Sequence, residues 1–143
     1  MSTPSNALQA AIYTRLTGFS ALTALIGASK VFDFVPQGAA APYVVIGDDT
    51  LTDDSTKTES GWDCTLTIHC WDFESAGRKS VKAILSAIYD ALHRQEASIA
   101  ITGFTLVELR SEFEETFQDP TVEGASDRYY HGVARYRAII EST

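Results

Sequence analysis

The stretch GWDCTLTIHCWDF, residues 61–73, divides its side chains into two sets that alternate along the chain. Because successive side chains of a β-strand point to opposite faces of a sheet, this alternation predicts a strand with one buried face. The inward, apolar set consists of Trp62, Cys64, Leu66, Ile68 and Cys70. The outward set consists of Asp63, Thr65, Thr67, His69 and Trp71. The two cysteines, six residues apart in one strand, should stand about 20 Å from each other, which is too far for a disulfide.

The segments on either side of this strand predict the fold class. Residues 75–94, SAGRKSVKAILSAIYDALHR, and residues 6–16 place apolar side chains at the spacing of an amphipathic helix. Further strands are predicted at residues 42–50, 104–117 and 128–140. The order helix, strands, helix, strands predicts one α+β domain over residues 1–143, with a mostly antiparallel sheet and two main helices packed on one face.

Length and charge restrict the function. A chain of 143 residues, 45% of them hydrophobic, is long enough for one globular domain with its own core. Its formal net charge of −8 and its pI near 4.7 argue against a protein that wraps nucleic acid, since such proteins need a basic face. No apolar run reaches the roughly 18–20 residues of a membrane span, and the first residues lack the pattern of a secretion signal. The sequence therefore predicts a protein made and kept in the cytosol, without a membrane partner.

The histidines His69, His93 and His131 are the candidates for catalytic or metal-binding chemistry. None has the spacing of a metal-ligand motif, and the chain lacks a nucleophile elbow, a phosphate-binding glycine loop and a CxxC pair. His69 and His131 are predicted to lie on neighbouring strands, where a nearby aspartate could complete a small site. We expect no catalytic residue, metal or cofactor, and keep a small cytosolic enzyme that uses His69 and His131 as a distant alternative.

Residues 47–60, GDDTLTDDSTKTES, form a sharply polar segment. Five acids and one lysine give it a local charge of −4, and Leu51 is its only large apolar residue. Its charged residues are Asp48, Asp49, Asp53, Asp54, Lys57 and Glu59. Such a segment cannot form a core on its own, so two interpretations stay open. It is either a polar loop or an extended hairpin arm that orders against a partner.

The closing stretch RYYHGVARYRAII, residues 128–140, carries arginines on its predicted outward face. In isolation these arginines indicate a surface for nucleic acid. However, the preceding strand, residues 104–117, is expected to pair with it, since consecutive strands usually do. That strand is predicted to turn Val107, Leu109, Phe113 and Phe117 inward and Glu108, Arg110, Glu112 and Glu114 outward. Glutamates opposite arginines would neutralise the basic stripe, so a large outward face of mixed charge favours contact with a partner subunit.

Three segments together resemble a known family. APYVVIGDD (41–49), TLTIHCWDF (65–73) and HGVARYRAII (131–140), separated by the acidic segment and the long helix, are similar to the tail completion, or tail terminator, proteins of long-tailed phages and gene transfer agents. The resemblance covers roughly residues 7–141. It implies a structural protein of the virion, a homo-oligomeric ring, commonly a hexamer, at the head–tail junction. Such a ring caps the tail tube, meets the head connector and lets DNA pass through an acidic lumen without specific binding.

This reading assigns surfaces instead of catalytic residues. Residues expected at the interface between subunits are Arg135, Arg137, Glu112, Glu114, Asp53, Asp54 and Lys57. Acids expected to line the lumen are Asp48, Asp49, Glu115 and Glu123. The closest alternative is a head-closure or connector adaptor protein of the same virion. A third alternative is a cytosolic regulator that dimerises through the same sheet.

Overall fold

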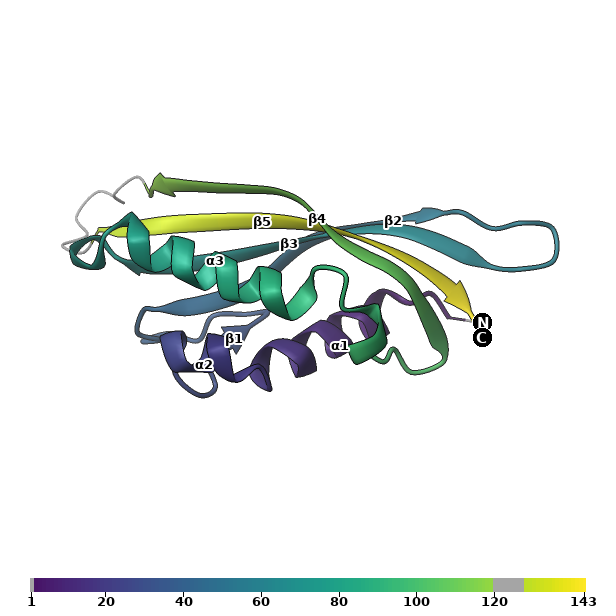
Figure 1. The fold of residues 1–143 in the computed structure, drawn as a ribbon, viewed down its shortest axis with the longest axis horizontal. Coiled ribbons are helices and arrows are strands. Elements are labelled where there is room, and N and C mark those ends of the chain that lie inside the picture. The colour runs from purple at the N-terminus through teal and green to yellow at the C-terminus, as the bar shows by residue number, and fades with distance from the viewer. Residues whose placement is uncertain (1, 120–127) are drawn as a thin grey trace.

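A five-stranded sheet carries three α-helices on one of its faces, and Figure 1 shows no element above its other face. The computed structural model describes residues 2–119 and 128–143. The strands are β1 (Val31–Phe32), β2 (Tyr43–Asp53), β3 (Gly61–Phe73), β4 (Phe104–Gln118) and β5 (Tyr129–Ser142). The helices are α1 (Ser5–Thr17), α2 (Ser20–Ile26) and α3 (Arg78–Leu92), with short 3-10 turns at Glu74–Ala76 and Glu96–Ser98. The strand order is β1-β2-β3-β5-β4, and every pair is antiparallel except β1 with β2. The predicted α+β class is confirmed.

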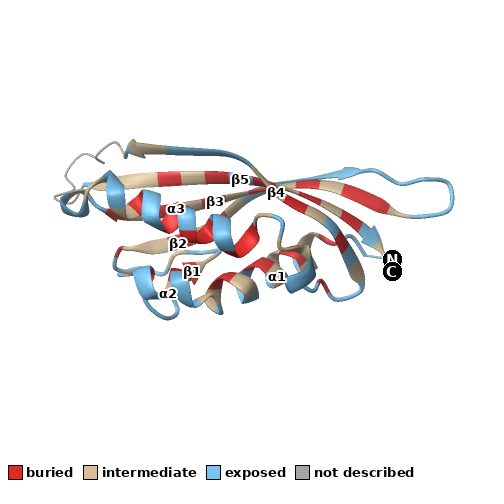
Figure 2. Ribbon diagram, in the orientation of Figure 1, coloured by how far each residue is buried: buried red, intermediate tan, exposed pale blue. Residues whose placement is uncertain are grey.

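The core lies between the sheet and the helices, where α3 presents one apolar stripe to β3 and β5 (Figure 2). Buried positions alternate along β3 and β5 as the sequence predicts. The buried stripe of α3 includes Val81, Ile84, Leu85, Ile88 and Leu92. Cys64 and Cys70 are buried free thiols on β3, which confirms the interpretation as small apolar side chains, and burial raises the pKa of Cys70 to about 12.

Glycine is required at position 132 because α3 approaches β5 closely there. A Cβ atom at Gly132 would lie 2.7 Å from Cys70 Sγ and 3.1 Å from Leu85 Cδ1. Real Cβ atoms do not approach other atoms to 2.7 Å, so any side chain at this position would displace Cys70 of β3 and press on Leu85 of α3.

The predicted faces of β4 are correct for Glu108, Leu109 and Arg110 but wrong for Val107, Phe113, Glu114 and Phe117. Register shifts between Leu106 and Glu108 and between Ser111 and Phe113 each insert an extra residue against β5. Because each bulge moves the following residues to the other face of the sheet, Phe113 pairs with Arg135 on the face away from the helices. Phe113 is 42% exposed there, and Val107, predicted to be inward, is 46% exposed. Phe117 is likewise outward, whereas Glu114 pairs with Ala134 and therefore points to the helix side.

Residues 47–60 form a hairpin arm that projects at one end of the molecule (Figure 1). Paired residues run out as far as Asp53 and Trp62, so the polar segment continues β2 and then turns back over residues 54–60. Residues 48–59 are all exposed. Of the two interpretations, a polar loop or an extended hairpin arm, the structure therefore shows the hairpin arm. That the arm orders against a partner stays a prediction. Within residues 2–119 and 128–143, no helix combines the length and apolar content needed to cross a membrane.

Candidate interaction surface

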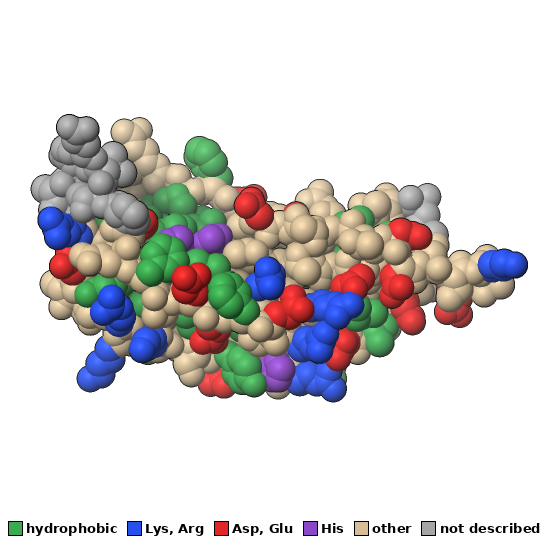
Figure 3. Space-filling model, turned by 90° about the horizontal axis from the view of Figure 1, so that it is seen from above, with side chains coloured by type: hydrophobic (Ala, Val, Ile, Leu, Met, Phe, Trp, Pro, Cys, Tyr) green, Lys and Arg blue, Asp and Glu red, His purple; other side chains and the backbone are tan. Residues whose placement is uncertain are grey.

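The face of the sheet opposite the helices, here called the open face, is the largest candidate surface (Figure 3). It consists of the outward side chains of the four long strands. From β3 and β5 these are Asp63, Thr65, Thr67, His69, Trp71, His131, Val133, Arg135, Arg137 and Ile139. Histidine and hydrophobic side chains gather toward one end of this face, and charges of both signs gather toward the arm. A solvated face seldom carries so many large side chains, which favours a partner.

The first part of the open face is a cluster of His69, Trp71, Phe117, Asp119 and His131, here called the histidine–tryptophan cluster. The Trp71 and His131 rings stack at 4.2 Å between centroids, and the Trp71 Nε1–H donates a hydrogen bond to Asp119 at 2.8 Å. Nδ1 of His69 and Nε2 of His131 share a hydrogen bond of 2.8 Å, so the two predicted neighbours do meet. Phe117 packs on His131 with centroids 4.7 Å apart.

Gly47 of β2 gives the cluster its space. A Cβ atom at this position would lie 2.7 Å from His69 Cδ2, so only a glycine lets the imidazole lie against β2. Burial lowers the pKa of His69, and the charge of Asp48 opposes that shift only in part. Burial and the neighbouring His69 lower the pKa of His131 to about 4. Both imidazoles are therefore neutral near pH 7.

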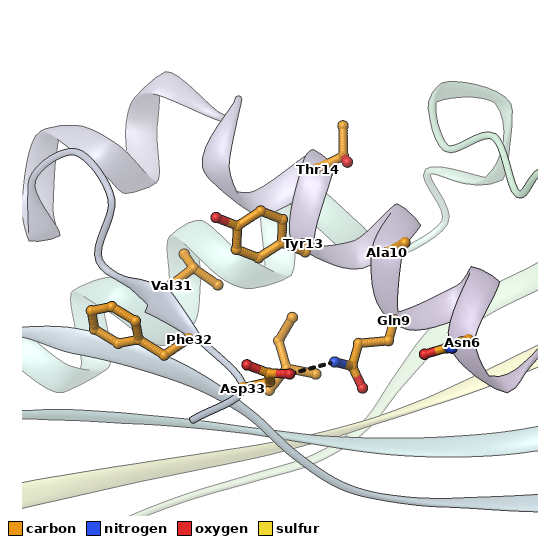
Figure 4. A pocket seen from close by; sticks show the side chains of 9 residues that line it. Asn6, Gln9, Ala10, Tyr13, Thr14, Val31, Phe32 and Asp33 are labelled. Atoms are coloured by element: carbon orange, nitrogen blue, oxygen red, sulfur yellow. Dashed lines mark hydrogen bonds between the residues drawn. The ribbon is translucent and has the colours of Figure 1, made fainter. Parts of the chain in front are cut away.

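This arrangement is built for packing. Each histidine ring is held by the other and by aromatic rings. In the described part of the chain no group of three or more His, Cys, Asp or Glu side chains is placed to hold a metal ion. None of the cluster residues lines the groove of about 460 Å³ that lies between α1 and β1 (Figure 4). The alternative of an active site at His69 and His131 correctly predicted that the two side chains meet. However, none of the cavities described adjoins them.

Acidification should destabilise the fold through His131. Its pKa falls from 6.5 to about 4 in the fold, so the unfolded chain binds the proton more readily. Stability from this group is complete above pH 6.5 and is lost as the pH falls toward 4, by about 2–3 kcal/mol. Urea unfolding of wild type and His131→Phe across this range measures the effect. The Phe ring retains the stacking, so the variant should show a shallower loss; parallel curves would contradict the assignment.

The second part of the open face holds ion pairs near the base of the arm. Arg137 forms a two-point ion pair with Asp63 of β3, with its Nε 2.8 Å from Oδ1. This pair holds the pKa of Asp63 below its ordinary value. Arg135 lies 3.5 Å from Glu112 and 5.5 Å above the Phe113 ring. The predicted cross-strand pairing of glutamate with arginine is therefore confirmed for Arg135 and wrong for Arg137.

Sequence reasoning missed Asp63 because only the pairing of the last two strands was considered. The central position of β5, between β4 and β3, places Asp63 one strand over from Arg137. The alternating pattern of residues 61–73 already predicted that Asp63 points outward, and this was the signal that could have identified it as a partner of Arg137. Opposite Arg137 on β4 stands Arg110, whose buried Nε has no hydrogen-bond partner in the described part of the chain.

The structure separates the remaining predicted residues. Asp53, Asp54 and Lys57 are exposed at the end of the arm. Asp49 faces the helix side, 3.5 Å from the hydroxyl of Ser5, and Glu115 is outward beside Val133. Glu123 lies outside the described residues.

A further surface that sequence reasoning missed is the groove between α1 and β1 (Figure 4). Gln9 donates a 3.1 Å hydrogen bond to Asp33 across it, and Tyr13 and Phe32 contribute aromatic lining. Phe34, just beyond this lining, is 81% exposed. No periodic pattern marks these residues because they come from a helix, a two-residue strand and a loop.

Comparisons with known proteins give two matches. The family described as "Tail completion protein gp17" matches residues 10–141. One chain of the solved structure "Virion of native gene transfer agent (GTA) particle" is 31% identical and has a TM-score of 0.81. That alignment covers 99% of this chain and 100% of the other. Among curated proteins, no sequence matches significantly.

Proposed function

Because this chain belongs to the tail completion protein gp17 family, we propose that it assembles as a ring on the end of the tail tube and joins the tube to the head connector. The chain is a structural protein of a phage-type tail and a component of the virion. This role follows from the family and from the full-length similarity to a gene transfer agent chain. The ring, expected to be a hexamer, its place at the head–tail junction and its contacts with tube and connector are the proposal.

The observation that carries the proposal is the open face together with the arm. A single chain leaves an entire sheet face of aromatic and charged side chains without a covering layer, and extends a hairpin away from its body. Both features suit a subunit whose remaining contacts are made by copies of itself or by other tail proteins.

The joint between subunits is proposed to run along the β4 edge and the base of the arm. Arg135, Arg137 and Glu112 lie on the open face near that base. Glu114 points to the helix side, yet β4 is the edge strand, so both glutamates can reach a neighbour there. At the other end of β2, Asp53, Asp54 and Lys57 would meet an adjacent subunit.

The lumen is proposed to be lined by acids. Glu115 is exposed on the open face, Asp48 is exposed at the base of the arm, and Asp49 is exposed on the helix side; Glu123 completes the proposed set. An acidic wall repels phosphates, so duplex DNA would slide through the ring without being held. The net charge of −8 agrees with this use.

Fractionation of assembly precursors tests the proposed place in the virion. Tails and heads from a producing strain are separated before they join, and each fraction is probed for the chain. A tail terminator travels with free tails. Recovery with free heads alone would instead support the alternative, a head-closure or connector adaptor.

Charge reversal at Arg135 should reduce ring formation. The side chain is 51% exposed, so Arg135→Glu removes one weak ion pair and should change the free energy of unfolding by less than about 1 kcal/mol. Like charges brought together at a subunit contact cost several times more, which should lower the yield of rings at least about tenfold. Lys30→Glu, next to β1 at the opposite edge of the sheet, is the control. Equal ring yields from both variants would place the joint elsewhere.

A further inference from the structure

Charge is distributed unevenly along the long axis of the molecule. The arm, at one end, carries five exposed acids and a single lysine. At the other end, α3 and β5 both begin, and Lys and Arg side chains gather there (Figures 1 and 3). Four exposed cations make up this second group, here called the basic end: Arg78, Lys79, Lys82 and Arg128.

The cations of the basic end are available to a partner, because they form few charged contacts within the described part of their own chain. Among the described residues, none of its four cations takes part in an ion pair. Asp72 accepts a hydrogen bond from Ser80 and Asp119 accepts one from Trp71, so these two acids are engaged, whereas Glu114 and Glu115 line a small pocket together with Lys82. The guanidinium of Arg78 lies 4.9 Å above the Tyr130 ring, which holds that cation in place at the surface.

The arm also needs a partner. Apart from its pairing with the start of β3, the outer part of β2 has no neighbouring strand within residues 2–119 and 128–143, since β1 pairs with Val44 and Val45 only. A two-stranded ribbon is marginally stable by itself in water. The long edge of β4 is an unsuitable neighbour for the arm. There the exposed acids of the arm would meet Glu112, Glu114 and Glu115, which carry the same charge.

We propose that the arm of one subunit docks on the basic end of the next copy. This inference rests on the proposed ring and names the contact that closes it. Arm and basic end lie at opposite ends of the long axis, so the contact is head-to-tail, the type that generates a ring when the rotation closes. Asp53, Asp54 and Glu59 would face Lys79, Lys82 and Arg128 of the neighbouring copy. Exposed charges attract only over about one Debye length, so high salt would open the ring.

The test uses paired charge reversals in the full chain. One variant carries Asp53→Lys and Asp54→Lys, a second carries Lys79→Glu and Lys82→Glu, and a third carries all four substitutions. Each is added to tails that lack the protein, and ring-capped tails are counted. A matched control, Lys30→Glu with Asp90→Lys, reverses exposed or half-exposed charges outside both surfaces. Circular dichroism checks that each variant is folded.

We expect each double variant to cap at least about tenfold fewer tails and the fourfold variant to recover, because the reversed arm then meets a reversed basic end. Removing the lone arm cation with Lys57→Glu should increase capping at high salt. Capping by both double variants at wild-type levels, or a folded fourfold variant that does not recover, would overturn the contact while leaving the proposed function standing. Failure of the wild-type chain itself to cap tails would overturn both.

Discussion

Shortening the arm should abolish assembly on tail ends and leave the fold intact. The change replaces residues 54–60 with a single Asn, so that Asn and Gly61 form a two-residue turn between the paired residues Asp53 and Trp62. Because the removed residues are exposed or half-exposed and lose one backbone hydrogen bond to β5, from the Ser142 N–H to the Ser60 carbonyl, the free energy of unfolding should fall by only about 1 kcal/mol. Loss of the arm's contact with its neighbour should remove ring-capped tails almost completely. Electron microscopy of tails incubated with the variant measures this.

Two further variants separate the arm from general damage. A replacement of residues 54–60 by seven Gly and Ser residues keeps the length of the arm and removes the charges of Asp54, Lys57 and Glu59, and should also reduce capping. Replacement of residues 37–40, an exposed or half-exposed loop away from the arm, should cap normally. Normal capping by the shortened variant would show that the arm does not take part in assembly.

The packing of α3 on β5 supplies the second large effect. Leu85 is 1% exposed and lies against the backbone of Gly132. Leu85→Ala should lower the free energy of unfolding by about 2–5 kcal/mol through the cavity it leaves. Gly132→Ala should lower it by about 1–3 kcal/mol, since the new Cβ would meet Cys70 Sγ at 2.7 Å. Urea unfolding of each variant provides the values.

The double variant identifies the mechanism. Truncating Leu85 frees space beside Gly132, so the two losses should sum to at least about 0.5 kcal/mol more than the loss in the double variant. Leu16→Ala, a buried site on α1, is the control and should add independently to Gly132→Ala. Simple additivity between the Leu85 and Gly132 changes would mean that helix and strand do not press on each other at this point.

Periodicity explains which parts of the fold could be predicted from the sequence. The strands β3 and β5 and the helix α3 follow one period each from end to end, so their faces were predicted correctly. The strand β4 was predicted as a strand, but the faces of Val107 and of the residues after the second bulge were not, because two bulges interrupt the period of two. Nothing in the local pattern of FTLVELRSEFEETF marks either bulge, which depends on pairing with β5.

The candidate surface divides in the same way. The proximity of His69 and His131 was predictable because both lie on long strands expected to be neighbours. The partner of Arg137 required the full strand order, and the groove beside Phe34 required the tertiary arrangement of three short segments. Composition alone left the arm open as loop or hairpin, since a Thr- and Asp-rich segment suits either.

The central claim is that copies of this chain form a closed ring at the end of the tail tube. Averaged electron-microscopy images of tails assembled with the chain, viewed along the tube axis, test it most directly. We expect a closed ring with one copy per repeat, six repeats for the expected hexamer, and each arm reaching the next copy. Tails that end without such a ring, while the chain sits on heads or as isolated copies, would contradict it.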